Sequence, residues 1–423
     1  MDAVDVVVVG LGFTGLPTAV AAARAGLRVV GVDSSPGRVR EVVAVRRGCG
    51  LGTVSEDALR AVLTDGRLVV RDAAAGTPAA GVHVLCLPTP DGRRGGADLG
   101  PLTTACRAVG RVLRRGDLVL VQSTCPPGTV AQSLVPALEN SAGLRAGVDF
   151  HVACAPMRID PGNGSHTFAS LPRVVGGHTA RCAQRAVRFL SAMTDEVAEV
   201  ATTCAAEVTK IFENTFRLVN ISLVNELGAV CRAYGVDVAE VLRAAGTKPF
   251  GFLRHQPSAG AGGDCVPVSA RFFAAAARRK GMLSPLVDAA LAVNEAMPAH
   301  TVHRLREALH TVGRSLRGAR ILVLGVTYKP DTPNVRQSAS VAVLEELRRE
   351  AAVEYHDPYV PELLLSDGTL LKGRDFRDVR EADLVVLMTP HRVFRDLPDL
   401  GVPVYDCSSG EPSGSGSAIE AAA

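Results

Sequence analysis

The chain has 423 residues, which is too long for one ordinary domain and long enough for two or three domains with separate cores. Its formal net charge is only +3, and 4% of its residues are aromatic. This composition offers neither a phosphate-tracking surface nor a stacking platform for bases, so nucleic acid is not an expected partner. The apolar runs are interrupted before they could span a bilayer, so no membrane segment is expected either.

The ten cysteines are scattered along the chain without any C-x-x-C pair, and no metal site is predicted. The chain begins on a strand-like apolar run and not on a signal peptide. These features favour reduced thiols and a cytoplasmic location.

The first 200 residues predict a Rossmann-like domain. The opening VDVVVVGLGFTGLPTAVAAARAGLRVVGVDSS has the pattern of a strand, a glycine turn, a helix and a second strand that ends at Asp33. Further apolar runs occur in VHVLCLPTP, DLVLVQSTCPPG and FHVACAP, separated by segments with helical spacing. This alternation predicts a doubly wound parallel sheet.

Two further domains and a tail follow. Residues 201–312 have long helical periodicity, interrupted by the glycine-rich loop GAGGDCVPVSA. Residues 313–412 return to alternating strands and helices, and residues 413–423 lack anything to bury and predict a frayed tail. The predicted fold class is therefore α/β, with two Rossmann-like doubly wound parallel-sheet domains joined by a central helical domain.

The glycine turn between the first strand and helix predicts a dinucleotide site. Gly10 permits the turn, Gly12 lets backbone approach a pyrophosphate, and Gly15 lets the helix pack closely on the strand. Asp33 should accept hydrogen bonds from a ribose diol and repel a 2′-phosphate, which favours NAD over NADP. The alternative is a glycine turn in a Rossmann-like fold that binds no nucleotide. Within the turn, the predicted contacts include Phe13 and Thr14.

Cys265 in the glycine-rich loop has two interpretations. A single cysteine is more often a small buried hydrophobe than a nucleophile. However, Lys210 and Asn214 lie one helical turn apart and share a face, and an ammonium and an amide that point the same way can hold an oxyanion. Such pairs are also common on solvated surfaces, so the residues alone leave both interpretations open.

The chain contains a series of short motifs. They are, in order, G-x-G-x-x-G, LPTP (87–90), STCPPGT (123–129), APMRIDPG (155–162), EVTKIFEN (207–214), NEL (225–227), TKPFGF (247–252), the GGDC loop and GVTYKPDTPNVRQS (325–338). The order of these motifs resembles the UDP-glucose/GDP-mannose dehydrogenase family over nearly the whole chain. TKPFGF and the DPGN run look most like the branch that oxidises UDP-N-acetylglucosamine.

The resemblance implies an NAD-dependent double oxidation of a nucleotide sugar, UDP-N-acetylglucosamine or UDP-glucose, at C6. It implies that Cys265 forms a thiohemiacetal and then a thioester, assisted by Lys210, Asn214 and Thr124. It also implies a homodimer formed through the central domain and a UDP-sugar-binding C-terminal domain. The further contacts that it implies are Pro88, Thr89, Ser123 and Thr124 for NAD, and Arg158, Lys210, Asn214, Phe252, Gly262, Lys329 and Arg336 for the sugar nucleotide. For Lys329 and Arg336, ordinary surface charge is the alternative.

Three departures from the family fall on its chemistry. Met157 stands where the family has the glutamate that assists water, Asp264 where it has a histidine, and Ser269 where it has an aspartate. General acid or base groups contribute about 10² to 10⁴ in rate, so the reaction could stop after one oxidation, return the hydride as an epimerase or isomerase does, or not occur in a chain that only binds. Negative charge is also absent at Gln122, Asn334 and Gln337, which stand where the resemblance predicts acids.

Overall fold

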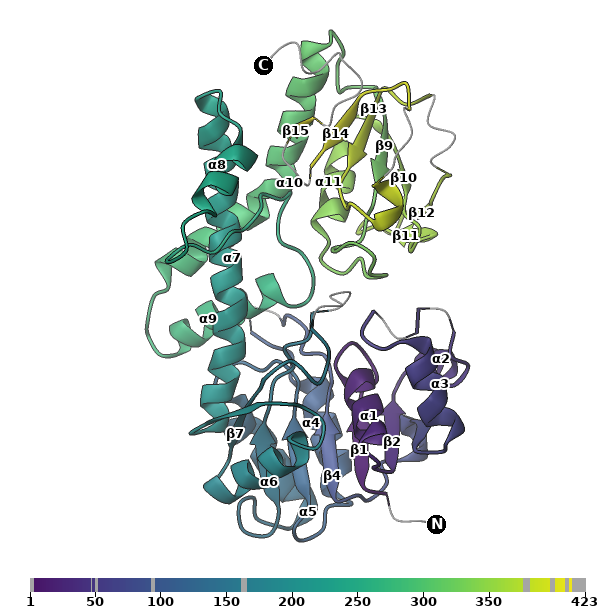
Figure 1. The fold of residues 1–423 in the computed structure, drawn as a ribbon, viewed down its shortest axis with the longest axis vertical. Helices are drawn as coiled ribbons and strands as arrows, with labels where there is room; N and C mark the ends of the chain where they lie inside the picture. The colour runs from purple at the N-terminus through teal and green to yellow at the C-terminus, as the bar shows by residue number, and fades with distance from the viewer. Residues whose placement is uncertain are drawn as a thin grey trace. The chain divides into compact units, whose positions relative to one another are not determined.

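The computed structural model describes residues 4–46, 48–49, 52–92, 96–160, 166–375, 381–395, 400–407 and 411–412. The chain forms two compact units, residues 1–213 with 271–282 and residues 214–270 with 283–423. Two of the three boundaries, after residues 213 and 270, fall inside helices, so the helices predicted as a central domain are shared between the two units (Figure 1). The domain limits after residues 200 and 312 stay predictions. The two helices that contain the boundaries are α7 (Thr203–Ala233) and α9 (Val266–Arg279).

The first unit is built on an eight-stranded sheet with the order β3-β2-β1-β4-β5-β6-β7-β8. Adjacent strands pair in parallel except β6 and β7, which are antiparallel. The order 3-2-1-4-5-6 is that of a dinucleotide-binding Rossmann sheet. The strands are β1 (Val6–Val9), β2 (Val29–Asp33), β3 (Leu68–Asp72), β4 (Val82–Leu85), β5 (Leu118–Val121), β6 (His151–Cys154), β7 (Arg173–Gly177) and β8 (Val197–Val200).

Helices cover both faces of this sheet, which explains its continuous apolar strands. All four valines of β1 are buried: Val6 and Val8 pack in one apolar cluster, and Val7 and Val9 pack in a second one. The first cluster includes side chains of α1, and the second includes side chains of α4 and α5. The helices of this unit are α1 (Gly15–Arg24), α2 (Pro36–Val43), α3 (Glu56–Thr64), α4 (Gly100–Gly110), α5 (Val135–Ala142) and α6 (Ala180–Leu190), with the short η1 (Ala73–Ala75) and η3 (Val130–Leu134).

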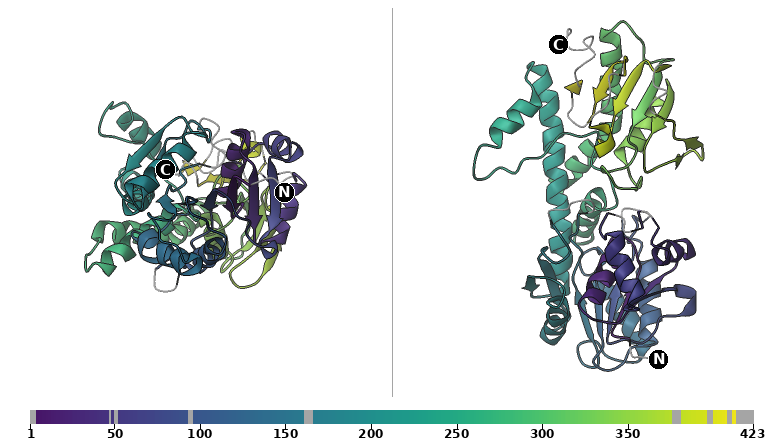
Figure 2. Two further views of the ribbon diagram at one scale, coloured as in Figure 1. Left: turned by 90° about the horizontal axis from the view of Figure 1, so that it is seen from below. Right: turned by 45° about the vertical axis from the view of Figure 1, so that its right-hand side comes forward.

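The second unit contains a five-stranded sheet with the order β10-β9-β13-β14-β15, seen in the right-hand view of Figure 2. Its strands are parallel except β15, which pairs antiparallel with β14. Ile321 and Val323 face a core that includes α10 and α11, and Leu322 packs with Phe394 on the other face. The elements are β9 (Arg320–Leu324), β10 (Ala352–His356), β13 (Leu384–Leu387), β14 (Val404–Asp406), β15 (Glu411–Pro412), the hairpin β11 (Glu362–Leu364) and β12 (Leu370–Lys372), α8 (Val238–Ala245), α10 (Pro285–Thr311), α11 (Ala339–Leu347) and η5 (Arg392–Phe394).

Within the part of the chain that the structure describes, no helix combines the length and the apolar character needed to cross a membrane. None of the ten cysteines, all of which lie among the described residues, forms a disulfide. The cytoplasmic location stays a prediction.

The topology determines where ligands can bind. The glycine turn, LPTP, STCPPGT and residues 155–160 of APMRIDPG follow β1, β4, β5 and β6 respectively; Pro161 and Gly162 of that motif lie outside the described residues. Because these four strands are parallel, all four segments meet at one edge of the sheet. The crevice outside the carboxyl ends of the strands is where open α/β sheets bind their ligands.

Candidate active site

The glycine turn has the geometry that a dinucleotide site needs. Gly10 has a φ of +92°, and a Cβ there would lie 2.5 Å from the carbonyl oxygen of Cys86. A Cβ on Gly15 would lie 1.7 Å from the carbonyl oxygen of Gly10, so only glycine permits α1 to begin so close to β1. At Gly12, by contrast, a Cβ would meet nothing within 4 Å, which leaves the space that a pyrophosphate requires.

Asp33, at the end of β2, is oriented by two backbone donors. Leu11 N donates to one carboxylate oxygen at 2.8 Å and Ser35 N donates to the other at 2.9 Å. Each oxygen keeps a lone pair for a ribose hydroxyl. The nearby Arg38 donates to the carbonyl oxygens of Leu11 and Cys49, so its guanidinium already holds the protein backbone and is not presented to a 2′-phosphate.

The loops after β4 and β5 are linked by their predicted NAD-contacting residues. Ser123 Oγ accepts from Leu87 N at 2.9 Å and donates to Leu87 O at 2.8 Å. Thr89 Oγ1 donates to the carbonyl oxygen of Thr124 at 2.5 Å. Pro88 is exposed and Thr124 is half-buried, so this linked pair of loops still presents surface at the sheet edge. Gly12, Phe13 and Thr14 are also partly exposed there.

Gln122 precedes this loop and is buried. Its Oε1 accepts a hydrogen bond from Thr18 Oγ1 at 2.7 Å and lies 3.5 Å from the Cys86 thiol. Its Nε2 has no hydrogen-bond partner among the described residues. The amide therefore ties the end of β5 to α1 but leaves one donor unused.

Met157 and Arg158, in the loop after β6, have different partners. Arg158 Nη2 forms an ion pair with Glu213 of α7 at 2.6 Å, and Nη1 donates to Pro172 O at 3.1 Å. Met157 is buried, and its Sδ lies 2.6 Å from Nη1 of Arg173, which is itself 1% exposed. No acid stands beside this guanidinium in the described part of the chain, because Met157 occupies the position next to it.

Glu207 in the first turns of α7 connects that helix to the STCPPGT loop. Its carboxylate accepts from Gly128 N at 2.6 Å and from Val130 N at 2.7 Å. Burial raises the pKa of Glu207 to about 7, although the two amide donors act in the opposite direction. Lys210 lies one turn further along α7, so Glu207 fixes the helix that carries Lys210 to the loop that carries Thr124.

The nucleophile loop meets α7 in the second unit. Cys265 is exposed and immediately precedes α9, and the amino end of a helix favours negative charge. Asn214 Nδ2 donates to Ser269 Oγ at 2.9 Å and to Cys265 O at 3.4 Å. The structure thus brings Asn214 to the nucleophile loop, and Ser269, which is 1% exposed, accepts the amide hydrogen bond.

Asp264 is directed toward Arg336. Its Oδ2 lies 3.4 Å from Arg336 Nη1 in an exposed ion pair. The loop also packs closely on the segment that contains Arg336: Gly263 N donates to Gln337 O at 3.2 Å, and a Cβ on Gly262 would lie 2.6 Å from that same oxygen. The predicted substrate contacts Gly262 and Arg336 therefore lie together.

Lys329 and Phe252 are the remaining predicted substrate contacts. Thr327 Oγ1 donates to the carbonyl oxygen of Lys329 at 3.0 Å, and Lys329 is half-buried. Phe252 is 39% exposed. Sequence reasoning missed the group that supports the Lys329 segment: Asp331 N donates to His391 Nδ1 at 2.8 Å, so His391 Nε2 carries the proton and donates to Asp357 at 3.0 Å.

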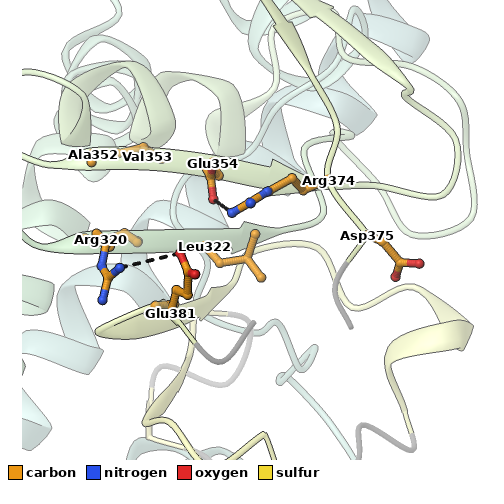
Figure 3. Close-up of a pocket in the computed structure, with 10 residues that line it drawn as sticks. Arg320, Leu322, Ala352, Val353, Glu354, Arg374, Asp375 and Glu381 are labelled. Atoms are coloured by element: carbon orange, nitrogen blue, oxygen red, sulfur yellow. Dashed lines mark hydrogen bonds and ion pairs between the residues drawn. The ribbon is translucent and has the colours of Figure 1, made fainter. Parts of the chain in front are cut away.

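A separate cavity of about 440 Å³ lies against β9 and β10 (Figure 3). Its charged side chains form two ion pairs, Arg320 with Glu381 and Arg374 with Glu354. Arg320 is the first residue of β9, so the cavity begins at the amino end of that strand and not at the carboxyl edge. We assign it no role in the site.

Family sequence profiles match three consecutive parts of the chain. They are the NAD-binding domain of the UDP-glucose/GDP-mannose dehydrogenase family over residues 4–194, its central domain over residues 204–296, and its UDP-binding domain over residues 322–404.

Characterised relatives are similar over most of the chain. The chain is 34% identical over 397 residues to UDP-N-acetyl-D-mannosamine dehydrogenase of Pyrococcus horikoshii, covering 93% of this chain and 90% of that protein. It is 33% identical over 362 residues to UDP-N-acetyl-D-glucosamine 6-dehydrogenase of Pseudomonas aeruginosa, covering 85% and 84%. The solved P. horikoshii enzyme matches with a TM-score of 0.87 and 31% identity over 98% of both chains. A UDP-glucose dehydrogenase from Pyrobaculum islandicum matches with a TM-score of 0.82 and 31% identity, over 96% of this chain and 94% of that one.

Proposed function

Because the chain belongs to the UDP-glucose/GDP-mannose dehydrogenase family, we propose that it oxidises the C6 alcohol of a UDP-sugar, with UDP-N-acetylglucosamine as the first candidate substrate. Membership of the family confirms the predicted resemblance, the α/β fold class and the NAD cofactor. Two relatives carry the names of N-acetylhexosamine dehydrogenases, and TKPFGF favours the same branch. UDP-glucose remains the second candidate substrate.

The observation that carries the proposal is the contact of Asn214 with the loop of Cys265. An aldehyde carbon donates a hydride only after a nucleophile has made it tetrahedral, so the second oxidation needs a thiolate and a partner for the resulting oxyanion. In this proposal Cys265 adds to the C6 aldehyde, and Lys210 and Asn214 stabilise the oxyanion of the thiohemiacetal.

The electrons and atoms balance over two oxidations. The C6 alcohol loses a hydride and a proton to give the aldehyde, the thiohemiacetal loses a second hydride and a proton to give the thioester, and water cleaves the C–S bond to give the carboxylate and the free thiol. Bound NAD supplies the hydride acceptor each time. Thr124 positions the substrate hydroxyl, and Arg158, Phe252, Gly262, Lys329 and Arg336 hold the sugar nucleotide.

A second candidate function is an oxidation that ends at the aldehyde. The observation in its favour is Met157, whose buried thioether cannot accept a proton from the water that would cleave the thioester, so the aldehyde is the last species that can leave the site without that cleavage. The redox-neutral and non-catalytic alternatives remain as further outcomes of the same experiment.

The test is the NADH yield and product mass with UDP-N-acetylglucosamine, UDP-glucose and UDP-N-acetylmannosamine. Two NADH per sugar and a uronate support the leading proposal. One NADH per sugar and an aldehyde support the second. If the protein produces no NADH and does not exchange the C6 hydrogen, both proposals are rejected. Cys265→Ser should stop the reaction before the uronate. Cys204→Ser, at a half-buried cysteine of α7, is the matched control.

We also propose that the protein is a homodimer with α7 at its interface. Phe216, Leu223 and Val230 recur every seven residues on one face of α7 and are 44%, 61% and 53% exposed. A stripe with this spacing is the pattern by which one helix packs against another. A second copy of the chain is the partner expected from the family resemblance.

A further inference from the structure

Arg173 is a buried cation at the ligand-binding edge of the NAD-binding sheet. It begins β7, whose antiparallel register pairs Gly177 with Ala153 and Gly176 with Cys154. Continuing this register beyond the end of β6 brings Arg173 beside Met157, at the edge where β4 and β5 also end. Arg173 nevertheless has only 1% of its surface exposed.

One edge of the Arg173 guanidinium has no partner among the residues that the structure describes. Its Nη1 faces Met157 Sδ, and the Phe168 ring stacks 4.1 Å from its Cζ. Nε and Nη2 are buried and have no acceptor in the described part of the chain. These two nitrogens form the side of a guanidinium whose parallel N–H bonds match both oxygens of a carboxylate.

In the described part of the chain, the surroundings of Arg173 add a donor but no negative charge. Gln122 Nε2 is a second buried donor without an acceptor among the residues described, and Gln122 and Arg173 both lie near Cys86. Burial raises the pKa of the Cys86 thiol, so at neutral pH this thiol is uncharged. The other charged neighbour, Arg158, is a cation already paired with Glu213.

Arg173 keeps its charge in spite of its burial. Burial lowers the pKa of Arg173 to about 10, which leaves the guanidinium protonated at neutral pH. A buried charge without a counter-ion is among the costliest features of a protein interior. Met157, which contacts Nη1, is unbranched and changes rotamer readily, so the side chain that packs against this guanidinium can shift while the sheet stays in place.

We propose that Arg173, assisted by Gln122, is a receptor for a carboxylate ligand at the carboxyl edge of the NAD-binding domain. The ligand's two oxygens accept from Nε and Nη2 of Arg173, and one of them also accepts from Gln122 Nε2. Two sources share this chemistry: the C6 carboxylate of a nucleotide-sugar uronate and a free small carboxylate. The first source rests on the proposed function, whereas the second does not.

The test compares carboxylate ligands with matched uncharged or halide ligands. Isothermal titration measures the affinities of UDP-glucuronate and UDP-glucose, and thermal unfolding measures the shift caused by formate against equal chloride. The variants are Arg173→Gln, Met157→Glu and the exposed control Arg181→Gln. Met157→Glu provides a resident carboxylate for Arg173, so it competes with the ligand without removing the buried cation.

We expect wild type and Arg181→Gln to bind UDP-glucuronate about ten- to a hundredfold more tightly than UDP-glucose, the range for hydrogen bonds to a charged group. Both Arg173→Gln and Met157→Glu should reduce this preference to less than about twofold. If neither nucleotide sugar binds but formate stabilises wild type and not Met157→Glu, the receptor is supported for a free small carboxylate, and UDP-glucose is rejected as the substrate of the proposed function. The receptor is overturned if wild type binds the two sugars with equal affinity and formate does not stabilise it. It is also overturned if Met157→Glu still prefers UDP-glucuronate over UDP-glucose.

Discussion

Replacing Glu207 with glutamine should change how the stability of the first unit depends on pH. The carboxyl is 1% exposed, and burial raises its pKa from 4.5 to about 7. Between these two values the folded protein holds a proton that the unfolded chain has lost, so the free energy of unfolding falls as pH rises. The free energy of unfolding falls by about 3 kcal/mol in total, and the fall is complete above about pH 7. Glu207→Gln cannot ionise and should lack this loss.

The assay is urea unfolding followed by far-UV circular dichroism, because the chain contains no tryptophan. Subtracting the free energy of unfolding of wild type from that of Glu207→Gln cancels the other titrating groups. The difference should rise by about 3 kcal/mol between pH 4.5 and pH 7.5. Glu226→Gln, at an exposed position of α7, controls for the loss of one carboxylate from that helix. A difference that stays constant within about 0.5 kcal/mol would show that the Gly128 and Val130 amides cancel the effect of burial on the pKa of Glu207, and would refute the reasoning.

Three further predictions concern the core, the cofactor and the interface. Burial lowers the pKa of His83 in β4 to about 4. The free energy of unfolding of wild type should therefore fall by up to about 3 kcal/mol as pH falls from 6.5 to 4. His83→Leu should not show this fall in the same urea assay. Asp33→Ala should raise the KM for NAD about ten- to a hundredfold and reduce the preference for NAD over NADP. Initial rates with each cofactor measure both effects. An unchanged KM for NAD would show that Asp33 does not contact the ribose. Leu223→Arg should dissociate the dimer, as measured by sedimentation velocity. Ala229→Arg, at an exposed position on another face of α7, should leave the dimer intact. A dimer that persists in both variants would place the interface elsewhere.

The opposite signs at Glu207 and His83 have a joint consequence. Between pH 4.5 and 6.5 one group lowers stability with rising pH and the other raises it by a similar amount. Wild type can therefore have a flat pH profile in this window although two buried groups titrate abnormally. Only the single variants separate the two contributions.

The fold and the glycine turn could be predicted because their signals are local. Val6 to Val9 form an unbroken apolar run, which is typical of a strand covered on both faces, and Gly10 follows it directly at the point of the turn. The spacing of Lys210 and Asn214 likewise follows from helix geometry alone. These inferences need no contact between distant parts of the chain.

The missed groups depend on distant contacts. Glu207 meets Gly128 from 79 residues away, and Asp264 meets Arg336 across 72 residues, so neither pairing is visible in a window of sequence. Arg173 did leave a signal: it is a charged residue beside a short apolar strand, in PRVVGG. A cation at the head of such a strand must find a counter-charge, a stacking partner or a ligand.

The three positions at which the resemblance predicts departures from the family have different physical consequences. Ser269 still accepts the hydrogen bond of Asn214, so that replacement keeps the amide oriented with a neutral partner. Asp264 pairs with Arg336 on the surface, which directs its charge toward the predicted substrate cation. Met157 alone leaves a buried cation that has no acid beside it among the residues described. If the extent of oxidation differs from that of the relatives, residue 157 is consequently the first position to change, because a carboxylate there would provide both a base for water and a counter-ion for Arg173.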